Sequence, residues 1–392
     1  MRRRDFVCFA ARCVATCAAA SLTPWAGLLP APGLGPGEAL AQAPPRELGW
    51  LGVKESPWFE ALAGKAVRCG LCPRECELGP GERGYCRVRE NRDGKLFTLV
   101  YGNPCALNVD PIEKKPFFHV LPGSASFSIA TAGCNMDCKF CQNWEISQAS
   151  PDDTPNYQLS PVAVAEMAQR YDCLSVASTY VEPTIFTEYM IDVGKEVQPK
   201  RMLNVMHSNG FIKAGPLDAL CERLDAACVD LKGFTEEYYS SMTDGELAPV
   251  LAALRQLRRR GKHIELVTLL VPGRNDDMAV IRDMCAWVRD ELGPDTPLHF
   301  SRFAPRYKLK SLPPTPLETL EKARETALAV GLRYVYLGNV PGSAGECTWC
   351  PRCNAELVSR VGYMTTVKAL DLGKAACAQC GEHIPGLWTL PA

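Results

Sequence analysis

Three cysteines near the middle of the chain have a spacing that is typical of an iron–sulfur centre. Cys134, Cys138 and Cys141 follow the pattern Cys-x3-Cys-x2-Cys. Three thiolates on one short loop can bind three corners of a cubane cluster and leave the fourth iron free of protein ligands. Such an open iron can bind a small molecule, so the spacing predicts a catalytic cluster. The structural alternative is three buried or disulfide-bonded cysteines.

Four cysteines near the C-terminus form a second pattern. They occur as two Cys-x2-Cys pairs separated by 23 residues, namely Cys350, Cys353, Cys377 and Cys380. Two such pairs are typical of a ribbon whose thiolates bind one metal ion. We predict structural zinc there, with a second iron–sulfur cluster as the alternative, because four thiolates suit both.

Four more cysteines precede the central triplet. They follow the spacing Cys-x2-Cys-x3-Cys-x9-Cys at Cys69, Cys72, Cys76 and Cys86. The spacing predicts a zinc site or an auxiliary iron–sulfur cluster. The alternatives are reduced cysteines packed under the neighbouring domain, or disulfides if the protein is exported.

The overall composition excludes several classes of protein. The 392 residues are 47% hydrophobic and 22% charged, which is ordinary for a globular protein with a buried core. The 43 basic and 44 acidic residues nearly cancel, so no positive field is available to hold a nucleic-acid backbone. We therefore expect no nucleic-acid partner, and we do not expect an integral membrane protein.

The first 41 residues are predicted to be a targeting signal. Arg3-Arg4-Asp5-Phe6 resembles the twin-arginine signature, an apolar stretch follows at 7–29, and Ala39-Leu40-Ala41 offers a cleavage site. This pattern predicts export of the folded protein to the periplasm. If the segment is not a functional signal, the protein is cytoplasmic.

The remaining chain divides into three parts that must position the cysteines. They are a Cys-rich N-terminal region at 42–122, a core at 123–345 and a Cys-rich, zinc-ribbon-like tail at 346–392. In the core, strands are predicted at 126–131, 174–179, 202–206, 227–231, 264–270, 298–303 and 334–337. Helices are predicted from Ser160 and Pro161 onward and at 185–197, 217–224, 249–260, 278–292 and 317–330. Strands that alternate with helices imply parallel pairing, so we predict an α/β fold with a partial (β/α) barrel.

Polar residues gather where these strands end, which is where barrel proteins carry their chemistry. Candidate site residues at the strand ends are Glu182, Ser208, Asn209, Asp230 and Lys232. Glu265, His299 and Arg302 are predicted to point toward the barrel mouth or interior, where they are candidate contacts for a ligand. The alternative is a buried ion pair of Glu265 with Arg302. His207 is interpreted as ordinary polar packing.

The central motif resembles the radical SAM superfamily, because the triplet follows a first strand and Phe140 matches the family's usual aromatic residue. A closer resemblance is to the radical SAM component of the AmmeMemoRadiSam system, which is related to pyruvate formate-lyase activating enzymes. The residues that carry it are 132–148, 110–116, 230–234, 299–303 and 338–342. The resemblance extends from about Cys69 to Gly386 and implies a [4Fe-4S] cluster on Cys134, Cys138 and Cys141, together with S-adenosylmethionine (SAM).

The resemblance also implies roles for the strand-end residues. Glu182 would bind the ammonium group of SAM and Lys232 would balance its carboxylate. Ser208, Asn209 and Asp230 would hold the ribose and the methionine moiety, with Phe140 near the adenine. His299 is a further candidate cofactor contact. Partners implied are an electron donor such as flavodoxin or ferredoxin and the protein partners of the AmmeMemoRadiSam system.

Three functions remain open at this point. The first is an oxidoreductase-like radical SAM enzyme that forms a 5'-deoxyadenosyl radical and acts on an unknown substrate. The second is an activase that places a glycyl radical on a partner enzyme. The third is an iron–sulfur or zinc electron-transfer protein without catalysis, and the set of strand-end residues argues against it.

Overall fold

A computed structural model of the chain describes residues 44–391. The predicted signal at residues 1–41 lies outside the described residues, so export stays a prediction. Within the described part, no helix combines the length and the apolar character that a lipid bilayer requires of a spanning segment.

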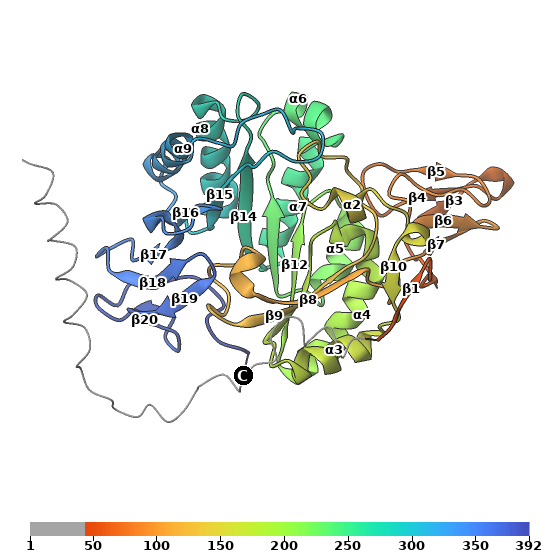
Figure 1. Ribbon diagram of the computed structural model, residues 1–392, viewed down its shortest axis with the longest axis horizontal. Helices are drawn as coiled ribbons and strands as arrows, with labels where there is room; N and C mark the ends of the chain where they lie inside the picture. Colours follow the sequence, from red (N-terminus) through yellow and green to blue (C-terminus); the bar gives the residue numbers. More distant parts are fainter. Residues whose placement is uncertain (1–43, 392) are drawn as a thin grey trace, which may run out of the picture.

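One large sheet forms the centre of the protein (Figure 1). Its strands are β8 Ala106–Pro111, β9 Ala125–Ala130, β11 Ser175–Ser178, β12 Leu203–Ser208, β13 Ala226–Asp230, β14 His263–Leu270, β15 Leu298–Arg302 and β16 Val335–Gly338. The spatial order is β16-β15-β14-β13-β12-β11-β9-β8, and all pairs from β9 to β16 are parallel. This arrangement confirms the predicted α/β partial barrel.

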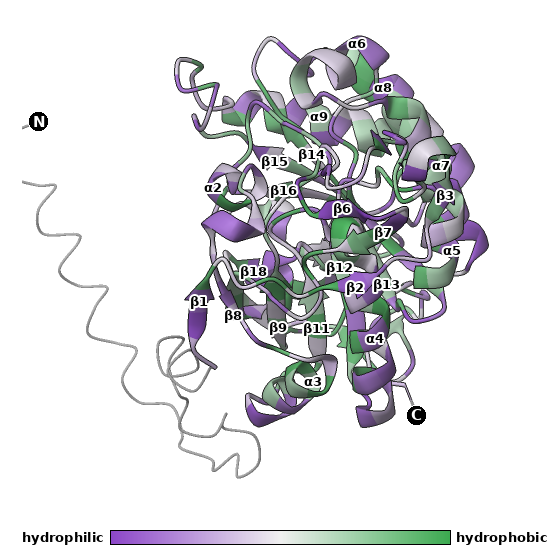
Figure 2. Cartoon of the chain, turned by 90° about the vertical axis from the view of Figure 1, so that its right-hand side faces the viewer, coloured by the Kyte–Doolittle hydropathy of each residue, from purple (hydrophilic) through white to green (hydrophobic). Residues whose placement is uncertain are grey.

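Helices form the outer layer of this barrel. They are α3 Pro161–Arg170, α4 Thr187–Val197, α5 Ala214–Cys221, α7 Leu247–Arg259, α8 Met278–Trp287 and α9 Leu317–Val330. In α7, the side chains of Val250, Leu254 and Leu257 recur at helical spacing and are buried. Figure 2 shows the hydrophobic and hydrophilic sides of α4, α5 and α7. The predicted start of α3 is observed, because the Ser160 side chain accepts a hydrogen bond from the Ala163 N–H at 3.2 Å.

Strand β8 is absent from the sequence prediction. It runs antiparallel to β9, with Ala106 opposite Ala130 and Pro111 opposite Ala125. Its buried positions do not alternate, so the period-2 signal that identifies a half-buried strand is missing. The central sheet therefore begins inside the region that the sequence assigns to residues 42–122.

Residues 112–121 fill the barrel near the amino ends of its strands. Ile112, Phe117 and Val120 are buried there against Leu203 and Ala226, the first residues of β12 and β13. The barrel is thus closed at this end, and its opposite end, at the carboxyl ends of the strands, is left for the site.

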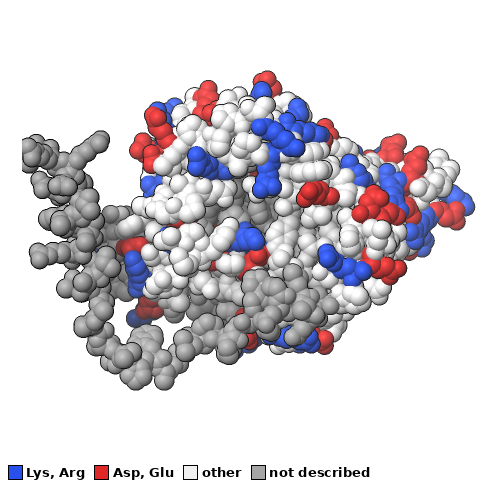
Figure 3. All heavy atoms as spheres, in the orientation of Figure 1, with Lys and Arg blue, Asp and Glu red and all other residues white. Residues whose placement is uncertain are grey.

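Smaller sheets flank the barrel at its two ends (Figure 1). The N-terminal strands are β1 Arg46–Leu48, β2 Lys54–Glu55, β3 Phe59–Ala61, β4 Val67–Cys69, β5 Glu77–Leu78, β6 Arg89–Arg92 and β7 Lys95–Thr98, with β1 pairing β10 Pro155–Tyr157. The C-terminal strands are β17 Thr348–Trp349, β18 Glu356–Val361, β19 Met364–Val367, β20 Leu370–Asp371 and β21 Ala376–Cys377. Figure 3 shows a hollow near the centre of one face, surrounded by charged side chains of both signs.

Candidate functional site

The cysteine triplet lies on the loop that follows β9. This loop leaves the strand through Gly133 and ends at the short helix α2 Trp144–Ser147. Gly133 has a φ of +95° and donates its N–H to the Ile146 carbonyl at 2.9 Å. Only glycine adopts this backbone conformation readily, so the sequence Ala-Gly-Cys turns the chain sharply at the barrel mouth.

Backbone hydrogen bonds hold this loop against a π-helical turn, Tyr239–Thr243. The Asp137 N–H donates to the Thr243 carbonyl and the Lys139 N–H to the Met242 carbonyl, each at 3.0 Å. Because the anchors are backbone groups, the positions of the three cysteines depend little on neighbouring side chains.

The three thiols lie within electrostatic range of one another. Burial, followed by Glu182 and then Cys138, raises the pKa of Cys134 well above its usual value. Burial also raises the pKa of Cys138 to about 12, although Lys232 acts in the opposite direction. The Cys141 sulfur lies 3.3 Å from the Ser147 hydroxyl. The three cysteines therefore lie beside Glu182 and Lys232, the acidic and basic residues predicted for the site.

Glu182 is a buried carboxylate whose hydrogen-bond donors are all neutral. It accepts the Thr184 N–H at 2.9 Å, the Ser208 hydroxyl at 2.7 Å and the Asn209 N–H at 2.6 Å. Burial raises the pKa of Glu182, although these three hydrogen bonds act in the opposite direction. A carboxylate offers about four acceptor positions, so one remains for a further donor.

Asp230 lies between two basic side chains. The Lys232 ammonium donates to it at 2.7 Å, and the His207 Nε2 lies 2.8 Å from its other oxygen. Burial disfavours the charged carboxylate, but Lys232 and then His207 outweigh it and hold the pKa of Asp230 well below its usual range. Lys232 uses one of its three donors here, which leaves two for a ligand.

Aromatic rings form the wall next to the loop. The buried ring of Phe140 stacks on Tyr238 with centroids 6.4 Å apart, and the Lys232 ammonium lies 5.9 Å from the Phe140 ring. An apolar face beside charged groups suits a ligand that has both a flat ring and a charged tail.

Three candidate residues, Glu265, His299 and Arg302, lie elsewhere. His299 is 2% exposed and its Nε2 lies 2.8 Å from Glu265, which also accepts the backbone N–H groups of Phe118 and His119. His299 therefore belongs to a network that ties the segment closing the barrel to β14 and β15, and the structure does not bring it to the cysteine loop. The alternative pairing of Glu265 with Arg302 is wrong.

Arg302 bonds to a different partner. Its Nε donates to the Thr315 carbonyl at 2.8 Å. The side chain therefore anchors the segment that follows β15. The partners of Glu265 are instead His263, at 3.2 Å, and His299.

Three residues of the site were missed by sequence reasoning. Asn135 accepts a hydrogen bond from the Asn209 amide at 2.8 Å, Tyr238 stacks on Phe140, and His207 contacts Asp230. Of these three, only His207 could have been found from the sequence. It lies near the carboxyl end of β12, and Asp230 ends the neighbouring strand β13. Asn135 reaches the site from the cysteine loop, and Tyr238 from the end of the short helix α6 Glu236–Tyr238.

Comparison with known proteins identifies the family. The sequence profile described as "Radical SAM superfamily" matches residues 128–285. The uncharacterized protein MJ0808 of Methanocaldococcus jannaschii is 44% identical over 332 residues, which cover 85% of this chain and 99% of that protein. The chain belongs to the radical SAM superfamily. A second uncharacterized protein of that organism, MJ0674, is 24% identical over 68% of this chain and 76% of its own length.

Solved structures resemble the radical SAM chain more distantly. A radical SAM methyltransferase from Sphaerobacter thermophilus has a TM-score of 0.45 at 13% identity, covering 61% of this chain and 72% of that chain. A domain of a pyruvate-formate lyase-activating enzyme from Bacteroides vulgatus has a TM-score of 0.38 at 14% identity, covering 42% of this chain and 98% of that chain.

Membership of the radical SAM superfamily implies cleavage of SAM at an iron–sulfur cluster. The residues present fit such a cluster, because Cys134, Cys138 and Cys141 come from one loop and share one electrostatic environment. Three thiols from a single loop suit a cubane with an open iron better than a closed structural site.

The C-terminal cysteines form a compact group. In the described part of the chain, Cys350, Cys353, Cys377 and Cys380 have sulfur atoms that all lie within 4.8 Å of one another. Burial alone would raise the pKa of Cys377, but backbone N–H groups of Cys380 and Gln379 lower it to about 7. These residues could therefore hold a single metal ion.

Proposed function

We propose that this protein is a radical SAM enzyme that binds SAM between Glu182 and Lys232 and acts on an organic substrate. The observation that carries the proposal is the position of Glu182 next to Cys134, because it is a buried carboxylate with a free acceptor position and only neutral donors. The ammonium group of SAM would supply the missing positive charge. A charge-assisted hydrogen bond of this kind is about twice as strong as a neutral one.

The remaining residues would orient the rest of SAM. Two free donors of Lys232 face the methionine carboxylate, and Phe140 with Tyr238 provides an apolar surface for the adenine. Ser208 and Asn209 act on SAM through Glu182, whose orientation they hold. When bound and reduced, the cluster supplies the electron that cleaves SAM into methionine and a 5'-deoxyadenosyl radical.

The finer assignment is to the radical SAM component of the AmmeMemoRadiSam system. The motif resemblance in residues 132–148 and 110–116 supports it. This assignment includes a low-potential electron donor such as flavodoxin or ferredoxin as a partner.

The C-terminal ribbon is proposed to bind zinc. The Cys350 and Cys380 sulfur atoms are 3.5 Å apart, and those of Cys353 and Cys377 are 3.6 Å apart. Tetrahedral zinc with Zn–S bonds of about 2.3 Å places sulfur atoms about 3.8 Å from one another. The observed spacing supports one ion at this site.

The proposed reaction is tested with anaerobically reconstituted protein, a chemical reductant and SAM. We expect methionine and 5'-deoxyadenosine to form. Cys141→Ala should abolish both products, because a cluster cannot stay bound by two thiolates of this loop. Cys285→Ala, at a buried cysteine of α8 outside all three groups, is the matched control and should keep both products. Reductant-dependent redox cycling of the wild-type protein without either product would instead identify an electron-transfer protein.

A further inference from the structure

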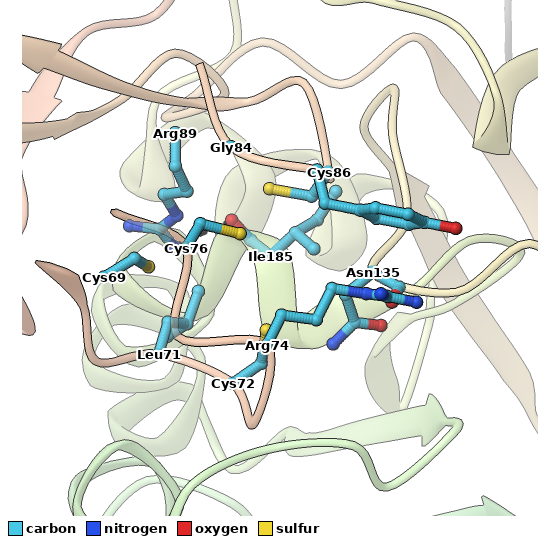
Figure 4. Close-up of a pocket in the computed structure, with 11 residues that line it drawn as sticks. Cys69, Leu71, Cys72, Arg74, Cys76, Gly84, Cys86, Arg89, Asn135 and Ile185 are labelled. Carbon is cyan, nitrogen blue, oxygen red and sulfur yellow. Dashed lines mark hydrogen bonds between the residues drawn. The ribbon is translucent and has the colours of Figure 1, made fainter. Parts of the chain in front are cut away.

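Four cysteines of the N-terminal region surround a hollow that the proposed reaction does not use. Cys69, Cys72, Cys76 and Cys86 line it together with Arg89 and Asn135. Figure 4 shows these side chains approaching the hollow from two loops, 69–76 and 84–89. All four are free thiols.

Tight turns determine where these thiols lie. The Cys69 N–H donates to the Cys76 carbonyl at 2.9 Å, and the Glu75 N–H donates to the Cys72 carbonyl at 3.2 Å. In the second loop, the Arg87 N–H donates to the Gly84 carbonyl at 2.8 Å. Backbone hydrogen bonds within each loop therefore fix the positions of the cysteines that line the hollow.

The spacing of the sulfur atoms distinguishes this group from the C-terminal one. Among the described residues, the group whose ligand atoms all lie within 4.8 Å of one another is Cys350, Cys353, Cys377 and Cys380, and no three of the N-terminal cysteines meet that limit. One zinc ion needs sulfur atoms about 3.8 Å apart. A cubane cluster separates its thiolates further, because each binds a different corner iron.

Arg89 supplies an independent sign of a ligand. Its side chain is 1% exposed, lines the hollow, and forms a two-pronged ion pair with Glu188. Its Nε–H is buried and has no hydrogen-bond acceptor. An unpaired buried donor destabilises the fold, because it has lost its hydrogen bonds to water without gaining a partner. A sulfide or thiolate in the hollow would provide the missing acceptor.

The hollow shares a wall with the loop of the central cysteines. Asn135, which follows Cys134, lines it, and the Arg74 guanidinium donates to the Asn135 carbonyl at 2.6 Å. A Cβ atom built on Gly133 would lie 2.5 Å from the Cys86 carbonyl oxygen. The backbones of the two cysteine groups are therefore packed directly against each other.

We propose that Cys69, Cys72, Cys76 and Cys86 bind a second cubane iron–sulfur cluster, with the Arg89 Nε–H donating to one of its sulfur atoms. Four protein thiolates saturate its four irons, so this cluster has no open corner for SAM. Arg74 and Arg89 at the wall are each paired with a carboxylate, that of Asp244 and that of Glu188, so the free Nε–H of Arg89 is the donor that they leave for such a ligand.

The first test counts metals in the full chain, produced and handled anaerobically. We expect about eight irons and about eight sulfides per chain with about one zinc. A count of about four irons with about two zincs would overturn the proposal in favour of zinc. About four irons with about one zinc would overturn it in favour of empty thiols.

Variants then assign the irons to their sites. The triple variant Cys134→Ala, Cys138→Ala and Cys141→Ala should keep about four irons and, once reduced, give an electron paramagnetic resonance signal that added SAM does not change. The double variant Cys72→Ser and Cys76→Ser should lose about four irons but keep a signal that SAM alters. Retention of the C-terminal zinc in each variant reports that the chain is folded. A triple variant that is folded and free of iron would contradict the proposal.

Discussion

Glu182 and Asp110 show two ways in which this protein stabilises a buried carboxylate. Glu182 is surrounded by neutral donors, and burial raises its pKa. Asp110 accepts hydrogen bonds from Lys114 at 2.8 Å, from Lys115 and from the Tyr180 hydroxyl. Burial opposes the charged form of Asp110, but Lys115 and the hydrogen bonds outweigh it and lower its pKa to about 2. The first carboxylate has only neutral donors, and the second has the cations of Lys114 and Lys115 beside it.

Removing the charge of Glu182 should weaken SAM binding. For Glu182→Gln we expect the Kd to rise about ten- to a hundredfold, because a hydrogen bond to a charged group contributes about 1.5–3 kcal/mol. Equilibrium binding to the cluster-loaded protein measures it. Glu166→Gln, at an exposed position of α3, is the matched control and should leave the Kd unchanged. An unaltered Kd in Glu182→Gln at full iron content would exclude the ammonium contact.

Asp110→Asn should destabilise the protein by about 3 kcal/mol at pH 7, because it leaves the buried Lys115 ammonium without its anionic partner. The folded pKa of about 2 lies below the unfolded value of about 3.9, so the carboxylate stabilises the fold above pH 4 and loses this effect as the pH falls toward 2. The difference between wild type and variant should therefore shrink between pH 5 and pH 3. Urea unfolding measures it, with Asp283→Asn, on the exposed side of α8, as the control. A constant difference across this range would rule out the charge of Asp110 as the cause.

At the scale of elements, the loop between β9 and α2 carries the central cysteine group and packs against the N-terminal one. Its backbone bonds to the π-helical turn Tyr239–Thr243 hold it on one side, and its contact with the Cys86 carbonyl holds it on the other.

The strand–helix alternation that builds the barrel is a local property of the sequence, and all seven predicted strands are present. Strand β8 was missed because its own residues show no strand pattern. It is a strand because it pairs with β9.

Gly133→Ala should disturb both cysteine groups. The new Cβ would lie 2.5 Å from the Cys86 carbonyl oxygen and 2.8 Å from a Val88 methyl group, at a φ of +95°. We expect a loss of about 1–3 kcal/mol from backbone strain, and a lower iron content after reconstitution. Gly261→Ala is the matched control, since its φ is +65° but no atom lies within 4 Å. It should keep its iron, and equal iron loss in both variants would refute the role of the contact.

At the scale of the whole molecule, the C-terminal ribbon fastens the segment that closes the barrel. The buried Arg360 of β18 donates to the Phe118 carbonyl at 2.7 Å and lies 4.1 Å from the Phe118 ring centroid. Cys350 and Cys377 share a hydrophobic cluster with Phe118 and with Tyr336 of β16. A change in the structure of the ribbon should therefore affect residues 112–121, which close this end of the barrel.

Loss of the metal ion from the C-terminal ribbon should make residues 112–121, at the closed end of the barrel, more mobile. For Cys353→Ser we expect loss of zinc, a Tm lower by several degrees, and faster amide hydrogen exchange in residues 112–121, since zinc binding supplies on the order of 10 kcal/mol to small metal-bound modules. Cys347→Ser is the control, because the Cys347 sulfur contacts the Arg360 backbone and stands outside the four-cysteine group. Unchanged exchange in Cys353→Ser, with its zinc lost, would disprove the coupling.

Short-range features of the sequence determine the barrel and the cysteine triplet. The Cys-x3-Cys-x2-Cys spacing, the strand–helix rhythm and the polar residues at the strand ends are properties of neighbouring residues, which is why they could be predicted. Choices between distant partners depend on the tertiary structure. Glu265 of β14 pairs with His299 of β15 instead of Arg302 of that same strand, and β8 joins the sheet beside β9, because the register and packing of separate strands select these partners. Sulfur spacing, which separates the compact C-terminal group from the wider N-terminal one, likewise depends on how the loops are packed.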